Sequence, residues 1–215
     1  YALAEYDAVH DLELHTHASA EAQVAALSDD IAYNNHDLHD GLRAGLFTDE
    51  DIMVLPLISQ AYAEVDAAYP NLEIDRRRHE ALRAVFGVMV SDVITTSAAI
   101  LAQSGAKSAH DIRHLGYPVI RFSDDVFASL GQIREFLFTQ MYRAPSVMEK
   151  RAEVTVVIRE LFPLFLNDPS QLPENWHAEL KGATETAITR RVCDYISGMT
   201  DRYALLEYER ILGPH

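Results

Sequence analysis

The sequence contains few of the residues on which several classes of protein depend. Cysteine occurs once, at Cys193, so the chain forms no internal disulfide and offers no cysteine-based metal site. No apolar run approaches the roughly 18 uninterrupted residues of a spanning helix, and we expect no membrane segment. The first residues show neither an initiator methionine nor the pattern of a signal peptide, so we expect the chain to begin inside a longer product. Together these absences predict a protein of the reducing cytoplasm.

Basic residues are also scarce. The chain holds 18 lysines and arginines against 33 acidic residues, which gives a formal charge of −15. Such a charge opposes nonspecific attraction to nucleic acid or anionic lipid, and we expect neither as a partner. A polyanionic ligand must therefore be held by a local basic cluster or by metal ions. The candidate clusters are Arg76, Arg77 and Arg78, and the pair Arg190 and Arg191.

What the sequence does contain is helical periodicity and enough apolar residues for a core. Of the 215 residues, 48% are hydrophobic and 24% are charged. Spacings of three, four and seven residues, with capping residues at their ends, predict an all-α fold of about seven to nine irregularly packed helices in a single domain over residues 1–215. The principal helices are expected over residues 21–44, 75–104, 123–143, 145–166 and 183–213.

Capping residues, proline and glycine refine these helix boundaries. Thr48 is expected to cap a short helix, and Pro56 to break or kink the chain after it. In the longest helix, over 75–104, apolar spacing predicts a buried central element that uses Leu82, Val85, Val88 or Met89, and Val93. Residues 107–122 read as a loop with one short extended piece, and Gly198 as the weak point of the last helical stretch.

One helix combines acidic and aromatic residues in an unusual way, in the stretch SDDIAYNNHDLHDGL over residues 28–42. At 100° per residue, Asp29, Tyr33, His36 and Asp40 fall in one narrow stripe, with Asp37 beside it. Carboxylates suit Mg²⁺ or Mn²⁺, and an imidazole adds a preference for transition metals. The stripe is also consistent with a solvated helix face that carries one core tyrosine, which spacing alone favours because acidic side chains are rarely buried, although spacing does not decide the matter.

A family resemblance bears on this choice. The stretch AEAQVAALSDDIAYNNHDLHDGLRAGLF, together with DYISGMTDRYALLEY near the end, resembles the C-terminal two thirds of a bacterial deoxyguanosine triphosphate triphosphohydrolase-like protein, a member of the HD superfamily of metal-dependent phosphohydrolases. The order of the helices between the two motifs also fits. The resemblance implies an irregular multi-helix domain of HD-superfamily type that lacks its N-terminal metal-binding helices.

The resemblance also implies roles for individual residues. Asp29 matches the last metal ligand of the family, Tyr33 the residue that packs against the substrate sugar, and Asp37 a further polar position of the pocket. His39 departs from the family pattern HDLDDG, which has aspartate there. The family's upstream histidine and its His-Asp pair would precede residue 1, so no catalytic residue is identified in this chain.

The adjacent arginines Arg190 and Arg191 are candidates for contact with the substrate phosphates. Guanidinium groups grip phosphate through two hydrogen bonds, and the family's C-terminal helices reach the nucleotide pocket. The same spacing is consistent with an ion pair between Arg190 and Asp194 on a helix surface. Both interpretations remain open for this pair.

By resemblance, the intact protein hydrolyses a deoxynucleoside triphosphate such as dGTP to the deoxynucleoside and tripolyphosphate. A divalent ion, Mg²⁺, Mn²⁺ or a similar transition metal, activates the attacking water. Family members form oligomers, so a homo-oligomer is expected. The alternative is a non-catalytic nucleotide-binding or oligomerisation module, because the upstream His and His-Asp ligands are not in the sequence.

Overall fold

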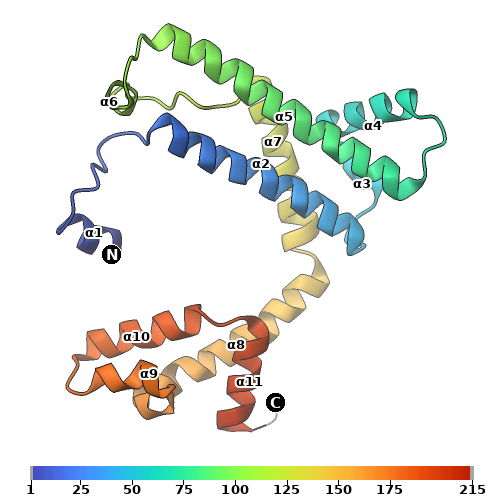
Figure 1. Ribbon diagram of the computed structural model, residues 1–215. Coiled ribbons are helices and arrows are strands. Elements are labelled where there is room, and N and C mark those ends of the chain that lie inside the picture. The colour runs from blue at the N-terminus through green and yellow to red at the C-terminus, as the bar shows by residue number, and fades with distance from the viewer. Residues whose placement is uncertain (1, 214–215) are drawn as a thin grey trace. The chain divides into compact units, whose positions relative to one another are not determined.

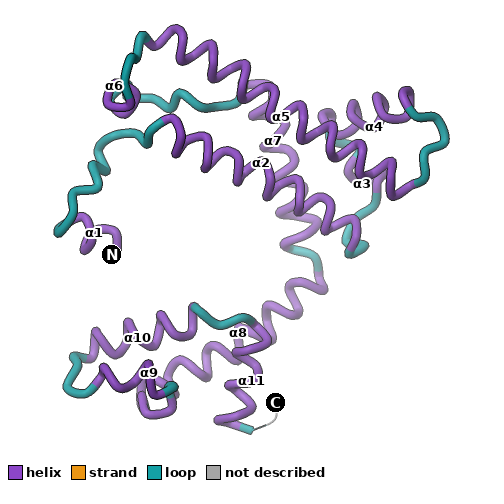
Figure 2. The backbone as a smooth tube through the Cα atoms, viewed as in Figure 1, coloured by secondary structure: helices purple, strands orange, loops and turns teal. Residues whose placement is uncertain are grey.

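The computed structural model describes residues 2–213, apart from the side chains of Ala2 and Glu179. Within that range the chain is built from helices and loops, without strands (Figures 1 and 2), which confirms the all-α prediction. The chain divides into two compact units, unit 1 over Tyr1–Tyr142 and unit 2 over Arg143–His215. The sequence analysis expects one domain over 1–215, whereas the structure gives each unit a hydrophobic core of its own.

Unit 1 is organised around two long helices that lie side by side in Figure 1, α2 and α5. Shorter helices pack on them, with α4 against α5 and α7 against α2. A π-helix over Phe138–Tyr142 continues directly from α7. The α-helices of this unit are α1 (Ala2–Asp7), α2 (Ala20–Arg43), α3 (Asp49–Ile52), α4 (Pro56–Ala68), α5 (Ile74–Ser104), α6 (Ala109–Arg113) and α7 (Asp124–Leu137).

Local capping chemistry sets most of these boundaries as predicted. Thr48 forms a reciprocal capping box with Asp51 at the start of α3, and Pro56 opens α4 at its first position. Ser123 accepts a hydrogen bond from the Val126 amide at the start of α7. Gly105 ends α5 in the left-handed conformation, with φ of 71°. The caps therefore confirm the sequence-based ends of these elements.

The C-terminal turn of α2 is shaped by a close contact with an aromatic ring. Gly41 is buried, and a Cβ added there would lie 2.1 Å from Phe47 Cζ. The Phe47 ring packs edge-on against Phe136 of α7, with ring centroids 5.0 Å apart. Glycine destabilises a helix relative to alanine, but at this position no side chain fits between the helix and the Phe47 ring.

The core of unit 1 is formed by the inward faces of these helices. Leu38 of α2 and Val85 and Met89 of α5 are fully buried. Of the predicted alternatives Val88 and Met89, the structure buries Met89 and leaves Val88 41% exposed. The prediction that α5 is buried as a central helix is therefore right for one face only, because its other apolar face carries exposed residues such as Ile94 at 64%.

A buried carboxylate joins the three helices α3, α4 and α5. Asp49 is 4% exposed and accepts hydrogen bonds from Tyr62 Oη at 2.6 Å and from Arg78 Nε at 2.8 Å. Burial raises the pKa of the Asp49 carboxyl, but the hydrogen bonds from Arg78 and Tyr62 outweigh burial and hold this pKa below its usual range. The carboxylate therefore stays charged and paired inside the unit.

Residues 107–122 differ from the expected loop in two ways. They contain the short helix α6, and the expected extended piece is not a strand. Instead, the amides of Val119 and Ile120 donate to Gln23 Oε1 of α2 at 2.9 and 3.1 Å, and the Arg121 amide donates to Ser97 Oγ of α5 at 3.1 Å. Side chains of the two long helices thus satisfy backbone amides that a sheet would otherwise pair.

Helix α5 is long and apolar enough to cross a membrane, judged by length and composition alone, with a mean hydropathy of 1.8 over an 18-residue window. A single helix of this kind is weak evidence, because the core helix of a soluble protein has the same composition. The window is only 17% buried within the structure. The absence of a membrane segment stays a prediction.

Unit 2 is formed by α8 (Pro145–Asn167), α9 (Glu174–His177), α10 (Glu185–Ser197) and α11 (Asp201–Leu212). Its core includes Leu161, Phe165 and Tyr195. The rings of Phe165 and Tyr195 meet edge-on, with their centroids 5.4 Å apart. The chain turns at Gly198, so the stretch predicted as one helix or two is two helices. The eleven α-helices of residues 2–213 exceed the predicted seven to nine because short helices occupy expected loops.

We predict that Asp49→Ala lowers the free energy of unfolding of unit 1 by about 3 kcal/mol, because it strands the buried Tyr62 hydroxyl and the charge of Arg78 without their shared partner. Urea unfolding followed by circular dichroism measures the change. Asp66→Ala is the matched control, since it breaks the more exposed ion pair with Arg77 (2.6 Å). Equal destabilisation by the two substitutions would contradict the role given to Asp49.

Candidate functional site

The predicted metal and sugar residues lie on one continuous helix. Helix α2 runs without interruption over Ala20–Arg43, so Asp29, Tyr33 and Asp37 follow one another at single helical turns. Asp29 is exposed, the Tyr33 side chain is 58% exposed, and Asp37 is half-buried. The opposite face of α2 is buried and supplies Ile31, Leu38 and Leu42 to the core. The tyrosine of this stripe is therefore a surface residue, not a core one.

A residue that sequence reasoning missed joins this stripe. Tyr142, the last residue of the π-helix, donates a hydrogen bond from its hydroxyl to the Asp37 carboxylate. Burial raises the pKa of the Tyr142 phenol, and hydrogen bonds with Asp37 and Tyr33 raise it further. We refer to Tyr33, Asp37 and Tyr142 as the Asp37 cluster.

The π-helix explains why Tyr142 reaches α2. A π-turn adds a residue to the helical turn and rotates the side chains that follow it, and such turns often occur at functional sites. The sequence offers no local signal for this contact, because 105 residues separate Asp37 from Tyr142. The predicted helix over 123–143 is correct in extent, but the sequence does not reveal that residues 138–142 form a π-helix.

A second link between α2 and α7 comes from the acidic residue next to Asp29. The Asp30 carboxylate forms an ion pair with Arg134 Nη2 at 3.0 Å. The Asp30 backbone carbonyl accepts a hydrogen bond from the side-chain amide of the buried Asn34 at 2.6 Å. Asp30 and Asp37 thus both contact the helical segment over residues 124–142. These contacts hold the stripe of α2 against that segment.

The two candidate phosphate ligands belong to unit 2. Arg190 Nε lies 3.1 Å from Asp194 Oδ1, in the helical pair that the sequence allows. The Arg191 guanidinium stacks over the Trp176 ring at 4.4 Å and donates to the carbonyl oxygens of Trp176 and Asn175, both at 3.3 Å. The contacts of Arg191 therefore attach α9 to α10, and a phosphate role for either arginine stays a prediction.

Metal ligands do not converge in the part of the chain that the structure describes. Residues 2–213 contain no group of three or more histidine, cysteine, aspartate or glutamate side chains placed to hold an ion. Asp29 nevertheless has the chemistry of a single ligand, since it is an exposed carboxylate held on a long helix. Its role as a metal ligand stays a prediction.

Comparisons with known proteins bear on the family. Residues 120–210 match the model of a phosphohydrolase-associated domain. The chain is 58% identical to a deoxyguanosinetriphosphate triphosphohydrolase-like protein of Cereibacter sphaeroides, covering 99% of this chain and 57% of that protein. It is 59% identical to a protein of the same name from Ruegeria sp., over 98% of this chain and 56% of that protein. It is 45% identical to one from Caulobacter sp., over 98% of this chain and 53% of that protein.

The chain belongs to the family of deoxyguanosinetriphosphate triphosphohydrolase-like proteins. The resemblance stated from the two sequence motifs is thereby confirmed. The chain spans little more than half the length of the curated relatives it matches. The phosphohydrolase-associated match begins at residue 120 and so includes Tyr142, whereas α2, with Asp29, Tyr33 and Asp37, precedes it.

We predict that Asp37→Asn lowers the pKa of the Tyr142 phenol. The change removes a negative charge that opposes the phenolate and a strong acceptor that favours the neutral phenol. NMR of tyrosine labelled with ¹³C at Cζ, followed through an alkaline titration, measures this pKa, with Tyr142→Phe assigning the signal. Asp40→Asn, the same change of charge at an exposed position of α2, should leave the titration where it was. An unchanged Tyr142 titration in Asp37→Asn would contradict the contact.

Proposed function

We propose that the whole protein hydrolyses a deoxynucleoside triphosphate to the deoxynucleoside and tripolyphosphate with the help of a divalent ion. Family membership supports the reaction class, since the relatives are named as triphosphohydrolase-like proteins. The observation that carries the proposal is the hydrogen bond between Tyr142 and Asp37 beside Tyr33, on the helix that bears Asp29.

Asp29 would supply one oxygen ligand to the ion. Its carboxylate is of the hard type that Mg²⁺ and Mn²⁺ prefer, and the helix fixes its position. Residues 2–213 contain no three potential ligands that converge, so the proposal assigns one ligand, Asp29, and leaves the others unassigned. When bound, the ion supplies Lewis-acid chemistry for the transfer of a phosphoryl group to water.

The Asp37 cluster would hold the deoxyribose. Asp37 accepts and Tyr142 donates, so the pair offers a sugar hydroxyl both kinds of hydrogen bond. The largely exposed ring of Tyr33 presents a flat apolar surface to the sugar ring. Because Asp37 and Tyr142 already pair with each other, the cluster keeps its geometry without ligand, which reduces the ordering cost of binding.

Phosphate charge would be neutralised by arginine. Arg190 and Arg191 remain the candidates from the sequence, and of the two Arg190 is the more exposed. Arg191 is held by Trp176, so its guanidinium would have to leave that ring to reach a phosphate. Arg190 pairs with Asp194 on its own helix, and a phosphate contact by either arginine stays a prediction.

The proposal is tested in the full-length protein encoded by the gene. We expect conversion of dGTP to deoxyguanosine and tripolyphosphate in the presence of Mn²⁺ or Mg²⁺, followed by chromatography of the nucleoside and ³¹P NMR of the polyphosphate. Asp29→Asn should reduce kcat/KM at least about 100-fold, because loss of a metal ligand exceeds the loss usually caused by its supporting residues. The helical circular dichroism should not change.

Asp40→Asn serves as the control, because it makes the same chemical change on an exposed position of α2. Metal-dependent turnover that survives Asp29→Asn would reject the assignment of Asp29. A full-length protein that binds dGTP without hydrolysing it under any divalent ion would instead establish the alternative, a non-catalytic nucleotide-binding module.

A further inference from the structure

Two histidines meet on the short helix α6, away from the acidic stripe of α2 and from the Asp37 cluster. His110 lies in this helix and His114 caps its C-terminal end, so the two residues are four positions apart. Their imidazole rings lie close together, with centroids 4.2 Å apart and planes inclined by 38°. Both residues are exposed to solvent. We call them the α6 histidine pair.

A hydrogen bond determines which nitrogen of His114 can bind an ion. Its Nδ1 lies 2.8 Å from the backbone carbonyl oxygen of His110. Because a carbonyl oxygen only accepts, Nδ1 carries the proton, and in the neutral ring Nε2 then has the lone pair. Histidines that bind metals almost always donate their other ring N–H in this way, most often to a carbonyl or carboxylate oxygen. His114 therefore already has the contact that orients a metal ligand.

The spacing of the pair suits one ion shared by both rings. A bond between a metal ion and an imidazole nitrogen is about 2 Å long, so two nitrogens on one ion lie about 3 Å apart. Side chains four residues apart on a helix face the same side. Because both residues are exposed, their rings can rotate to this separation without displacing core residues.

The charges around α6 do not oppose a cation. Asp111 accepts a hydrogen bond from the Lys107 amide at 2.9 Å, and this bond is the main cause that holds the pKa of the Asp111 carboxyl below its usual range. Arg113 Nη1 pairs with Glu13 Oε2 at 2.9 Å. The two basic residues beside the pair are thus balanced by two acidic ones, in a chain whose formal charge is −15.

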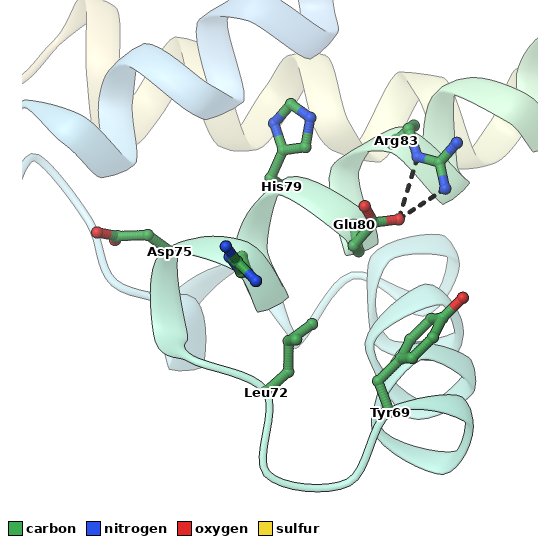
Figure 3. A pocket seen from close by; sticks show the side chains of 7 residues that line it. Tyr69, Leu72, Asp75, His79, Glu80 and Arg83 are labelled. Atoms are coloured by element: carbon green, nitrogen blue, oxygen red, sulfur yellow. Dashed lines mark hydrogen bonds and ion pairs between the residues drawn. The ribbon is translucent and has the colours of Figure 1, made fainter.

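His79 of α5 shows how a histidine beside acidic residues can lack this arrangement. It lines a cavity at the start of α5 together with Asp75 and Glu80. In Figure 3, dashed lines join Glu80 to Arg83, with which it forms an ion pair at 2.7 Å. Asp75 pairs with Arg78 at 3.5 Å. An ion that used His79 and either carboxylate would have to displace a guanidinium group.

We propose that the α6 histidine pair binds one divalent transition-metal ion of the Zn²⁺ type. The ion is held by His114 Nε2 and a ring nitrogen of His110, and water completes its coordination. Imidazole suits Zn²⁺, Cu²⁺ and Ni²⁺, whereas Mg²⁺ prefers oxygen ligands. The site therefore takes an ion of a different kind from the one proposed at Asp29, and it does not rest on the proposed hydrolysis.

The ion would also stabilise the attachment of the segment that leads into α2. It joins His110 to His114 across α6 and so fixes the turn that contains Arg113. The Arg113 side chain pairs with Glu13, and its backbone carbonyl accepts from the His17 amide at 2.9 Å. Both partners lie in the segment between α1 and α2. A bound ion therefore favours the ordered form of this segment, because a ligand stabilises the conformation that binds it.

The first test is calorimetric titration of the full-length protein, without a histidine tag and freed of metal, with ZnCl₂ in excess Mg²⁺. The Asp29→Asn background reduces binding at the proposed hydrolytic site. We expect His110→Gln and His114→Gln, each made singly, to weaken one zinc-binding step at least tenfold, because loss of a ligand exceeds the loss of a supporting residue. His10→Gln/His79→Gln, at two other exposed histidines, should leave this step within twofold.

The second test identifies the nitrogen that binds. In NMR spectra of protein labelled with ¹⁵N in its histidine rings, Zn²⁺ should shift the Nε2 signal of His114 far more than its Nδ1 signal. His114→Gln assigns the signals, and circular dichroism confirms that each variant keeps its helices. A dominant shift of Nδ1 would contradict the orientation given by the His110 carbonyl.

Three calorimetric results would overturn the proposal. The first is zinc binding that both single substitutions leave intact, and the second is binding weakened by only one of them, which would indicate an adventitious ion on a single imidazole. The third is displacement of Zn²⁺ by Mg²⁺. None of these depends on turnover of dGTP, so failure here is distinguishable from failure of the proposed hydrolysis.

Discussion

The packing of one face of α2 is the constraint on which the rest of unit 1 depends. Ile31, Leu38 and Leu42 are all but removed from solvent, and each contributes on the order of 2 kcal/mol of apolar burial. Because these residues fix the rotation of the helix, every other side chain on it has a defined direction. The residues of the acidic stripe point where they do because the apolar face cannot turn. A function placed on α2 is therefore tied to the core rather than to a mobile loop.

The acidic residues of α2 differ in what surrounds them, although the sequence makes them look alike. Asp30 pairs with Arg134, and Asp37 accepts from Tyr142, so both attach the helix to the segment after it. Asp29 and Asp40 are exposed. The surplus of negative charge on this helix is thus partly neutralised by specific partners. The negative charge that remains lies on Asp29 and Asp40, two turns and more apart along the helix.

Local chemistry was predictable from the sequence, and contacts between distant segments were not. The caps at Thr48 and Ser123 and the end at Gly105 follow from the preferences of single residues, and the structure confirms them. The approach of Tyr142 to Asp37 depends on a π-turn whose extra residue no periodicity reveals. Met89 rather than Val88 is buried because, at 100° per residue, Met89 falls between Leu82 and Val85 on the buried stripe of α5, whereas Val88 falls beside it. The division into two units likewise depends on which helices share a core, and amphipathic spacing does not predict which helices pack together.

His39 shows how family comparison and the structure complement each other. At His39 the family pattern quoted from the resemblance has an aspartate, so comparison alone marks the residue as a departure. The structure gives the departure a setting, because His39 lines a cavity between α2 and α5 together with His79 and Arg83, and Arg83 is already paired with Glu80. The departure therefore falls outside the Asp37 cluster, where Tyr33 and Asp37 keep the residues that the resemblance implies.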